Sequence, residues 1–328
     1  MKTTKKEEKV TPAILATAEE HGVELTVKDM TKKYAKEVNE KIDETPEIVG
    51  KIMKYAFKKH ILIEGEKGSG KTYSISKFLH DAGIETVFMA GHEGLESIDL
   101  LGYLIPEASG ELVWKDGALT EAFRKAQHGP TVLFYDELLR TPSRELNILV
   151  GALSPNAQGN YVLRTGRVLG VENGIAIEET LVVPSFNLWV IGTTNVGAGY
   201  SVDVIDEALA DRFRIVRKDT EEDEMRSILK KKFSTFFKDE DYTRELMKLY
   251  SYLKELNKKG DLNKVVNLRH LTEVIEFSDG TKESLIANVV DLIPHWVDRD
   301  SDGYINSAQK ELVLKSIVRA FDISESAL

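Results

Sequence analysis

Short apolar runs alternate with helical patterns over the first two thirds of the chain. The runs lie at 61–64, 86–89, 131–135, 188–192 and 214–216. Strands that alternate with helices form parallel sheets that are covered by helices on both faces. The pattern therefore predicts an α/β fold with a five-stranded parallel sheet between helices.

From residue 219 onward the pattern changes to helices only. Amphipathic stretches follow one another at 222–237, 242–257, 268–277, 282–297 and 307–321. They predict an all-α domain of about 110 residues. Upstream of the first strand, a helical pattern starts near residue 11. We expect an N-terminal tail and helical extension over 1–45, an α/β domain over 46–218 and a helical domain over 219–328.

A phosphate-binding loop follows the first apolar run. Residues 65–72 match the pattern GxxxxGK[ST], in which glycines let the backbone turn its N–H groups toward an anion at a helix start. Lys71 would pair with the β- and γ-phosphates, and the Thr72 hydroxyl would reach Mg²⁺. The alternative is a glycine-rich surface turn. The expected nucleotide-binding residues are Gly65, Glu66, Lys67, Gly68, Ser69, Gly70, Lys71 and Thr72.

Two later runs end in polar side chains. Asp136 and Glu137 follow the run 132–135, at the sheet edge where ligands of α/β proteins bind. Asp136 is expected to hold Mg²⁺ and Glu137 to orient and deprotonate the attacking water, whereas the alternative is a solvated helix start. Asn195 ends the run that starts at Leu188 and could contact the γ-phosphate, or simply form a strand-end turn.

Composition narrows the function classes. The chain has 328 residues, 42% of them hydrophobic and 30% charged, and its 0 cysteines exclude a disulfide framework, a thiol nucleophile and a cysteine metal site. The charged N-terminus lacks the apolar stretch of a signal peptide, and no run approaches the ~20 apolar residues of a membrane span. We expect a cytoplasmic protein. A net charge of -10 argues against general affinity for nucleic acid, although a local basic pore stays open.

Taken in order, these elements and the stretch 206–214 resemble the AAA+ ATPases. The segments 97–103, 107–114 (hairpin-like), 115–119 and 136–142, with 146–153, are similar to the MoxR branch with its CbbQ, NorQ and gas-vesicle GvpN relatives. The resemblance covers about residues 45 to 275. It implies a helical lid over 219–328, a ring that is usually a hexamer, ATP-driven remodelling, and a partner that often carries a von Willebrand factor A domain.

The resemblance also assigns roles to arginines. Arg212 matches the finger that reaches the neighbouring subunit's site, with Arg214 as the second candidate. A salt-bridge arginine beside a strand is the alternative for both. Arg269, at a helix start in 267–271, resembles the second sensor that contacts the γ-phosphate from the lid, although a solvent-facing helix arginine is the competing interpretation.

Two further features of the family pattern involve arginines. Arg140 matches an arginine that follows the acidic pair and is expected at the subunit interface, with an ordinary helix-surface arginine as the alternative. The segment 161–185 stands where related proteins carry a hairpin that points to the ring pore. Its Arg164 and Arg167 could contact a substrate, or the segment could be a plain two-stranded flap.

An acidic loop at 298–309 lies outside the family pattern. Asp298, Asp300 and Asp302 follow the spacing of a calcium loop, with Gly303 at the sharp turn and helical patterns on both sides. The twelfth position is Gln309, a neutral and weaker ligand than the usual Glu. A weak Ca²⁺ site and an acidic loop between helices therefore both remain open.

The sequence predicts a Mg²⁺-dependent ATPase that remodels a partner protein, for activation, assembly or insertion of a metal or cofactor, with sites shared between subunits. One alternative is a nucleic-acid motor similar to the McrB GTPases. Another is a nucleotide-regulated assembly scaffold. The preference for ATP over GTP, the client and the ring size are not fixed by the residues.

Overall fold

The computed structural model describes residues 46–196, 205–219, 221–238, 240–264 and 266–324. The predicted extension over 1–45 lies outside them. Contacts divide the chain into two compact units. Among the described residues, the first unit contains 46–64, 71–195 and 205–218. The second unit contains 65–70, residue 196 and the described residues from 219 to 324. The predicted domain limits stay a proposal.

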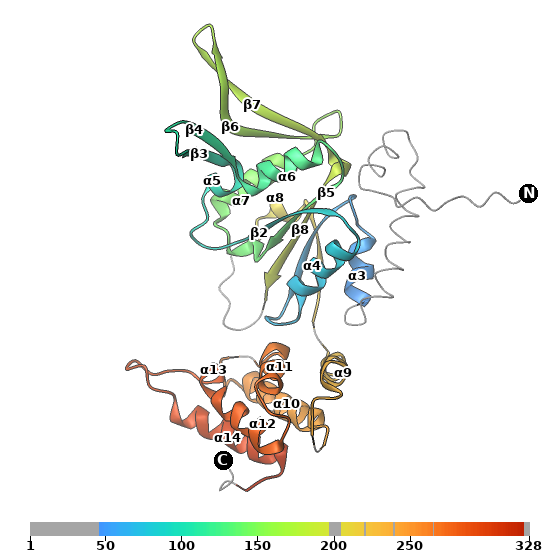
Figure 1. Cartoon of the computed structure of the whole chain (residues 1–328), viewed down its shortest axis with the longest axis vertical. Coiled ribbons are helices and arrows are strands. Elements are labelled where there is room, and N and C mark those ends of the chain that lie inside the picture. The colour runs from blue at the N-terminus through green and yellow to red at the C-terminus, as the bar shows by residue number, and fades with distance from the viewer. Residues whose placement is uncertain (1–45, 197–204, 220, 239, 265, 325–328) are drawn as a thin grey trace, which may run out of the picture. The chain divides into compact units, whose positions relative to one another are not determined.

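The first unit contains a five-stranded sheet in the order β2-β5-β8-β1-β9 (Figure 1). The pairs β1–β9, β2–β5 and β5–β8 are parallel. The five predicted strands are therefore confirmed, as is the α/β class. The strands are β1 (His60–Gly65), β2 (Glu85–Ala90), β5 (Thr131–Asp136), β8 (Leu188–Asn195) and β9 (Phe213–Arg217).

Both faces of the sheet are buried, because alternate residues of each strand enter different cores. Leu62 and Leu133 pack in the core that contains residues of α6 and α7. Ile61 and Ile63 pack in the core with α3 and α4. Side chains alternate across a strand, so a strand covered on both faces reads as a continuous apolar run. The helices are α3 (Pro46–Met53), α4 (Lys71–Asp81), α5 (Ser97–Leu101), α6 (Ala118–Ala126), α7 (Ser143–Ala152) and α8 (Glu207–Ala210), with the 3-10 turns η1 (Leu138–Arg140) and η2 (Ser185–Asn187).

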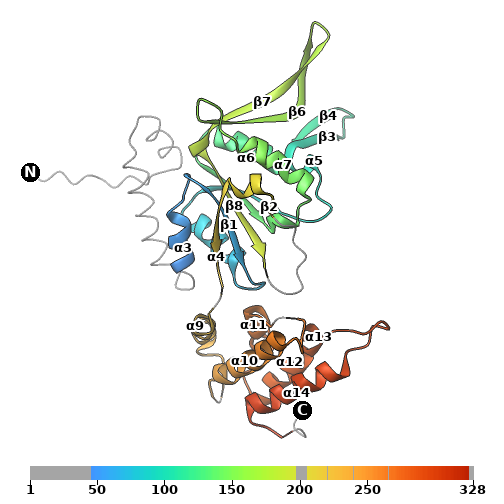
Figure 2. The ribbon, with the colours of Figure 1, turned by 180° about the vertical axis from the view of Figure 1, so that it is seen from behind.

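Two hairpins extend from this unit (Figures 1 and 2). They are β3 (Gly102–Pro106) with β4 (Leu112–Asp116), and β6 (Asn160–Glu172) with β7 (Ile175–Pro184). The second one turns at Asn173 and Gly174, whose φ angles of 51° and 79° suit a tight hairpin of right-handed twist. The second hairpin lies where the segment 161–185 predicted one, whereas the first begins at Gly102, before the predicted hairpin-like segment 107–114.

Arg124 on α6 joins the two hairpins. Its guanidinium donates to both carboxylate oxygens of Asp116 in β4, at 2.5 and 3.1 Å, and to both oxygens of Glu179 in β7, at 3.0 and 2.7 Å. Glu179 also accepts from Thr165 of β6 at 3.0 Å. The four bonds to two carboxylates raise the pKa of Arg124 above its ordinary value and lower that of Glu179.

The second unit carries the helices from Asp219 onward. Their apolar faces share one core, which includes Leu246, Leu271, Trp296 and Ile317. The predicted helix 282–297 is two helices, and Pro294 stands at the start of the second, where its missing N–H does no harm. No described helix has the length and apolar character that crossing a membrane requires. The helices are α9 (Glu222–Phe233), α10 (Thr243–Lys259), α11 (Leu268–Glu276), α12 (Lys282–Asp291), α13 (Ile293–Trp296) and α14 (Ser307–Phe321).

Candidate active site

The predicted phosphate loop joins β1 to α4. Gly68 and Gly70 have φ angles of 77° and 76°, a region that side chains with a Cβ rarely adopt. Lys71 and Thr72 begin α4, and its first turn carries no acidic residue. The helix itself therefore places no carboxylate at the positive end of its dipole, which suits a phosphate. Lys71 is buried.

The strand β5 delivers Asp136 beside Thr72. The Thr72 hydroxyl donates to Asp136 Oδ1 at 2.8 Å, and Thr193 of β8 donates to the same oxygen. Hydroxyl and carboxylate oxygens are the donors that Mg²⁺ prefers. Thr72 and Asp136 therefore fit the metal role that the sequence predicts, with Thr193 as an added support of the carboxylate.

Glu137 stands in a restricted backbone conformation. Its φ of 51° and ψ of 40° are left-handed, which is uncommon for a residue with a side chain. Its N–H donates to Thr193 Oγ1 at 3.0 Å. A single threonine hydroxyl thus contacts both members of the acidic pair. Thr193 is not among the residues that the sequence predicted for the site, although a polar residue inside a buried strand was the available signal.

Asn195 links the phosphate loop lysine to Glu137. Its Oδ1 accepts from Lys71 Nζ at 2.9 Å, and its Nδ2 donates to Glu137 Oε1 at 3.0 Å. The other oxygen of Glu137 accepts from Arg140 at 2.6 Å. The structure therefore brings together five residues from three segments that are far apart in the sequence: Lys71, Thr72, Asp136, Glu137 and Asn195.

The sequence of this part of the chain is similar to known proteins. Residues 60–213 match the model of the AAA domain, dynein-related subfamily. NorQ of Paracoccus denitrificans is 27% identical over 128 residues, which are 39% of this chain and 43% of NorQ. Residues 60–213 therefore form an AAA domain, and the similarity to NorQ supports an AAA+ protein of the MoxR type. The predicted family is thereby confirmed, although the match spans less than half the length of NorQ.

Other relatives of this AAA+ protein differ widely in length. An uncharacterised protein of Staphylococcus epidermidis is 22% identical over 267 residues, 78% of this chain and 91% of its own. Midasin of Dictyostelium discoideum is 34% identical over 125 residues, 37% of this chain and 2% of midasin. A solved structure of a candidate ATPase from Cytophaga hutchinsonii matches 91% of this chain and 88% of its own chain at 16% identity, with a TM-score of 0.45.

Arg212, the predicted finger, is held inside its own AAA+ subunit. Its guanidinium donates to the Val150 carbonyl at 2.9 Å, and to the Ala208 carbonyl and the Ser154 hydroxyl. Arg214 instead lies 5.7 Å from the ring centre of Tyr55. None of these contacts of Arg212 and Arg214 involves one of the five site residues. The role of either arginine as a finger for a neighbouring site stays a prediction.

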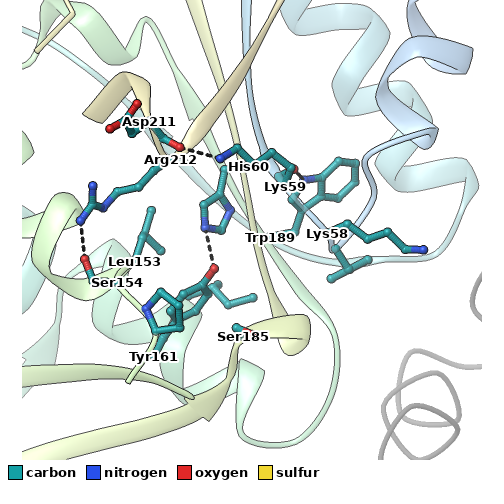
Figure 3. Close-up of a pocket in the computed structure, with 13 residues that line it drawn as sticks. Lys58, Lys59, His60, Leu153, Ser154, Tyr161, Ser185, Trp189, Asp211 and Arg212 are labelled. Atoms are coloured by element: carbon teal, nitrogen blue, oxygen red, sulfur yellow. Dashed lines mark hydrogen bonds between the residues drawn. The ribbon is translucent and has the colours of Figure 1, made fainter. Parts of the chain in front are cut away.

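Arg212 lines a cavity of about 350 Å³ (Figure 3). The cavity lies where β1 and β8 begin, since His60 and Leu188 line it, and the phosphate loop follows the opposite end of β1. His60 Nδ1 accepts from the Val190 N–H at 3.0 Å, which leaves the proton on Nε2 for Tyr161. Burial lowers the pKa of His60 to about 3. The imidazole is therefore neutral and structural.

Arg269 lies in the first turn of α11, which Asn267 caps by accepting from the His270 N–H at 3.2 Å. Burial, and then the charge of His295, lower the pKa of His270 to about 4. Arg269 belongs to the second unit, and its predicted sensor role stays a prediction.

The geometry does not support the calcium loop. Asp298 Oδ2 accepts from Asn263 at 2.7 Å and from Gln309 Nε2 at 3.0 Å, while Gln309 Oε1 accepts from the Asp298 N–H. Gln309 thus turns a donor toward the position of a cation. Across the residues that the structure describes, no group of three or more His, Cys, Asp or Glu could hold a metal ion. Asp300 caps its own turn through the Asp302 and Tyr304 N–H groups.

Proposed function

We propose that this AAA+ protein hydrolyses ATP at the carboxyl edge of its sheet. The supporting observation is the hydrogen-bonded chain from Lys71 through Asn195 to Glu137, which starts at the phosphate loop and ends at a carboxylate. A cation for the phosphate and a base for the water are thus joined by an amide that can sense both. No other set of side chains in the described residues combines these parts.

Each residue has a separate task in the proposed reaction. Glu137 orients the attacking water and takes its proton, while Lys71 stabilises the negative charge of the transferring phosphoryl group. Thr72 and Asp136 would hold Mg²⁺, which supplies further charge stabilisation when bound. Asn195 bonds both Lys71 and Glu137, so its amide is placed to exchange these bonds for contacts with the γ-phosphate.

The proposed active site is completed by an arginine of a second subunit. The subunits are expected to form a ring of six. Arg212 is our first candidate and Arg214 the second. Arg212 would have to leave the Val150 and Ala208 carbonyls and the Ser154 hydroxyl to reach a neighbour's nucleotide. Oligomerisation thus competes with bonds inside the subunit.

The proposed task is to remodel a partner protein. Nine of the fifteen large apolar side chains that are exposed among the described residues lie on the two hairpins, including Leu112, Val171 and Ile175. Such concentrations of exposed apolar surface mark interaction sites. From the resemblance to the MoxR type we also propose a client that gains a metal or cofactor and a partner with a von Willebrand factor A domain. The proposed location is the cytoplasm.

Substitution of the base tests the enzymatic part. The Glu137→Gln variant is expected to bind ATP like the wild type and to lose at least 100-fold in turnover, as general bases typically contribute about 10² to 10⁴. Glu121→Gln, in an exposed ion pair on α6, is the matched control. Undiminished hydrolysis by Glu137→Gln would refute the assignment. Parallel assays with GTP and with DNA separate a GTPase or a nucleic-acid motor from the proposed ATPase.

Mixing of two inactive variants tests the shared site. Arg212→Ala keeps Glu137, whereas Glu137→Gln keeps the arginine, so mixed rings contain some complete sites. Turnover should reappear on mixing. The same experiment with Arg214→Ala distinguishes the two candidates, and a melting curve of each variant shows whether the fold is intact. If turnover is recovered with neither Arg212→Ala nor Arg214→Ala, neither arginine acts in the site of a neighbouring subunit.

A further inference from the structure

Both carboxylate oxygens of Glu137 are engaged in the structure. Oε1 accepts from the Asn195 amide at 3.0 Å and Oε2 accepts from the Arg140 guanidinium at 2.6 Å. The two contacts differ in chemistry. The first donor is the neutral amide of a residue that itself bonds Lys71, whereas the second donor is the charged guanidinium of a residue outside the phosphate-binding elements.

The Arg140 contact opposes the role of Glu137 as a base. A base must present an oxygen lone pair within hydrogen-bond reach of the water proton. A guanidinium has five donors and no acceptor, so it occupies lone pairs on the carboxylate and cannot take a proton from the water or pass it on. A short bond to a cation therefore restrains the carboxylate orientation and takes up a lone pair of Oε2 that could otherwise meet the water proton.

The local fold lets only the side chains move. Glu137 is set by its left-handed backbone and by the bond from its N–H to Thr193. The next residues, Leu138 and Leu139, are buried in the core, which anchors the 3-10 turn that carries Arg140. The Arg140 side chain itself is 45% exposed. Because exposed ion pairs contribute little net stability, the guanidinium can leave Glu137 without disturbing the turn.

We propose that Arg140 is a positioning residue that restrains Glu137 in the resting subunit. The inference rests on the proposed ATPase function and adds a regulation of the same site. Arg140 keeps the carboxylate turned to itself and to Asn195, and hydrolysis starts when the guanidinium is withdrawn. The contact lies within one subunit, so it is independent of any arginine supplied by a neighbour.

Steady-state ATP hydrolysis by the full chain tests the restraint, with kcat and KM measured for wild type, Arg140→Gln and Arg140→Lys. Arg140→Gln should raise kcat about two- to five-fold, the factor that corresponds to the coupling of an exposed ion pair. KM for ATP should stay within about two-fold, because Arg140 has no part in the phosphate loop. Arg140→Lys should lie between, since an ammonium can still pair with the carboxylate.

Arg226→Gln is the matched control, because it removes another exposed arginine that pairs with an acid three residues away, Asp223 on α9. Its kcat should equal that of wild type. A gain in kcat at constant KM cannot come from damage to the fold. Unchanged or lower kcat in Arg140→Gln overturns the restraint, and a loss that wild-type subunits rescue on mixing would instead place Arg140 at a neighbour's phosphate.

Failure of the proposed function gives a different result. In that case neither wild type nor Arg140→Gln hydrolyses ATP faster than the Glu137→Gln variant. Both the ATPase function and the restraint by Arg140 are then refuted. If wild type hydrolyses ATP and Arg140→Gln does not exceed it, only the restraint is refuted. Binding of a fluorescent ATP analogue to each variant confirms that the nucleotide site is intact in either case.

Discussion

Replacement of Arg124 by methionine should loosen both hairpins of the α/β unit together. The change keeps the aliphatic stem but removes four hydrogen bonds, and it leaves Asp116 and Glu179 without their shared cation. The side chain of Glu179 is only 11% exposed, that of Asp116 23% and that of Arg124 31%.

These exposures set the magnitude. Loss of one partner from a fully buried ion pair costs about 3–5 kcal/mol, whereas an exposed pair contributes about 0–1 kcal/mol. The Arg124 pairs lie between these limits, so we expect a local destabilisation of about 2 kcal/mol. This value corresponds to an increase of about 30-fold in the amide exchange of backbone groups that open with the hairpins.

Hydrogen exchange followed by mass spectrometry measures the effect in β4 and β7 separately. Both strands should exchange faster in Arg124→Met. Lys125 lies on the same helix as Arg124, and Lys125→Gln, which removes its exposed ion pairs with Glu85 and Glu121, should leave exchange in both strands unchanged. Adding Glu179→Gln to Arg124→Met should recover part of the loss in β7, because no buried charge is then left unpaired.

The pH dependence follows from Glu179. Its pKa is lowered from the ordinary 4.5, chiefly by its bond with Arg124. A lowered folded-state pKa gives stability that is present above the unfolded-state value and is lost as the pH falls through the folded-state value. The difference between wild type and Arg124→Met should thus be constant near neutral pH and shrink below about pH 4.5. Faster exchange in only one hairpin, or a difference that grows on acidification, would refute this reasoning.

Two further predictions concern single contacts. Thr193→Val removes the hydroxyl that contacts Asp136 and the Glu137 N–H, so it should lower kcat more than it changes KM and destabilise the unit by about 1–3 kcal/mol in a urea titration. Thr194→Val is its control, since the buried Thr194 hydroxyl has no hydrogen-bond partner among the described residues and its loss should be neutral; equal effects of both would contradict the assignment. Millimolar Ca²⁺ should leave the melting temperature unchanged, because the amides of Gln309 and Asn263 already donate to the Asp298 carboxylate. A rise of several degrees would instead support a calcium site in this loop.

Local sequence patterns predicted the strands of the sheet and most residues of the candidate site. A strand buried on both faces must be apolar throughout, so the runs around Leu62 and Leu133 predicted the sheet before any partner strand was known. The glycines of the phosphate loop and the polar ends of β5 and β8 similarly predicted Lys71, Asp136, Glu137 and Asn195. These signals are local because backbone geometry and burial act on neighbouring residues.

The sequence by itself therefore determined the class of fold, the sheet edge that carries the chemistry and the residues at the ends of its strands. The tertiary structure decided which side chains touch: that Thr193 contacts both acids, that Arg140 holds Glu137, and that Arg124 joins the two hairpins by reaching Glu179, 55 residues further along the chain. It also showed Arg212 bonded within its own subunit. The physical reason is that a hydrogen bond depends on distance and direction between groups, and only the packed chain sets these for residues from different elements.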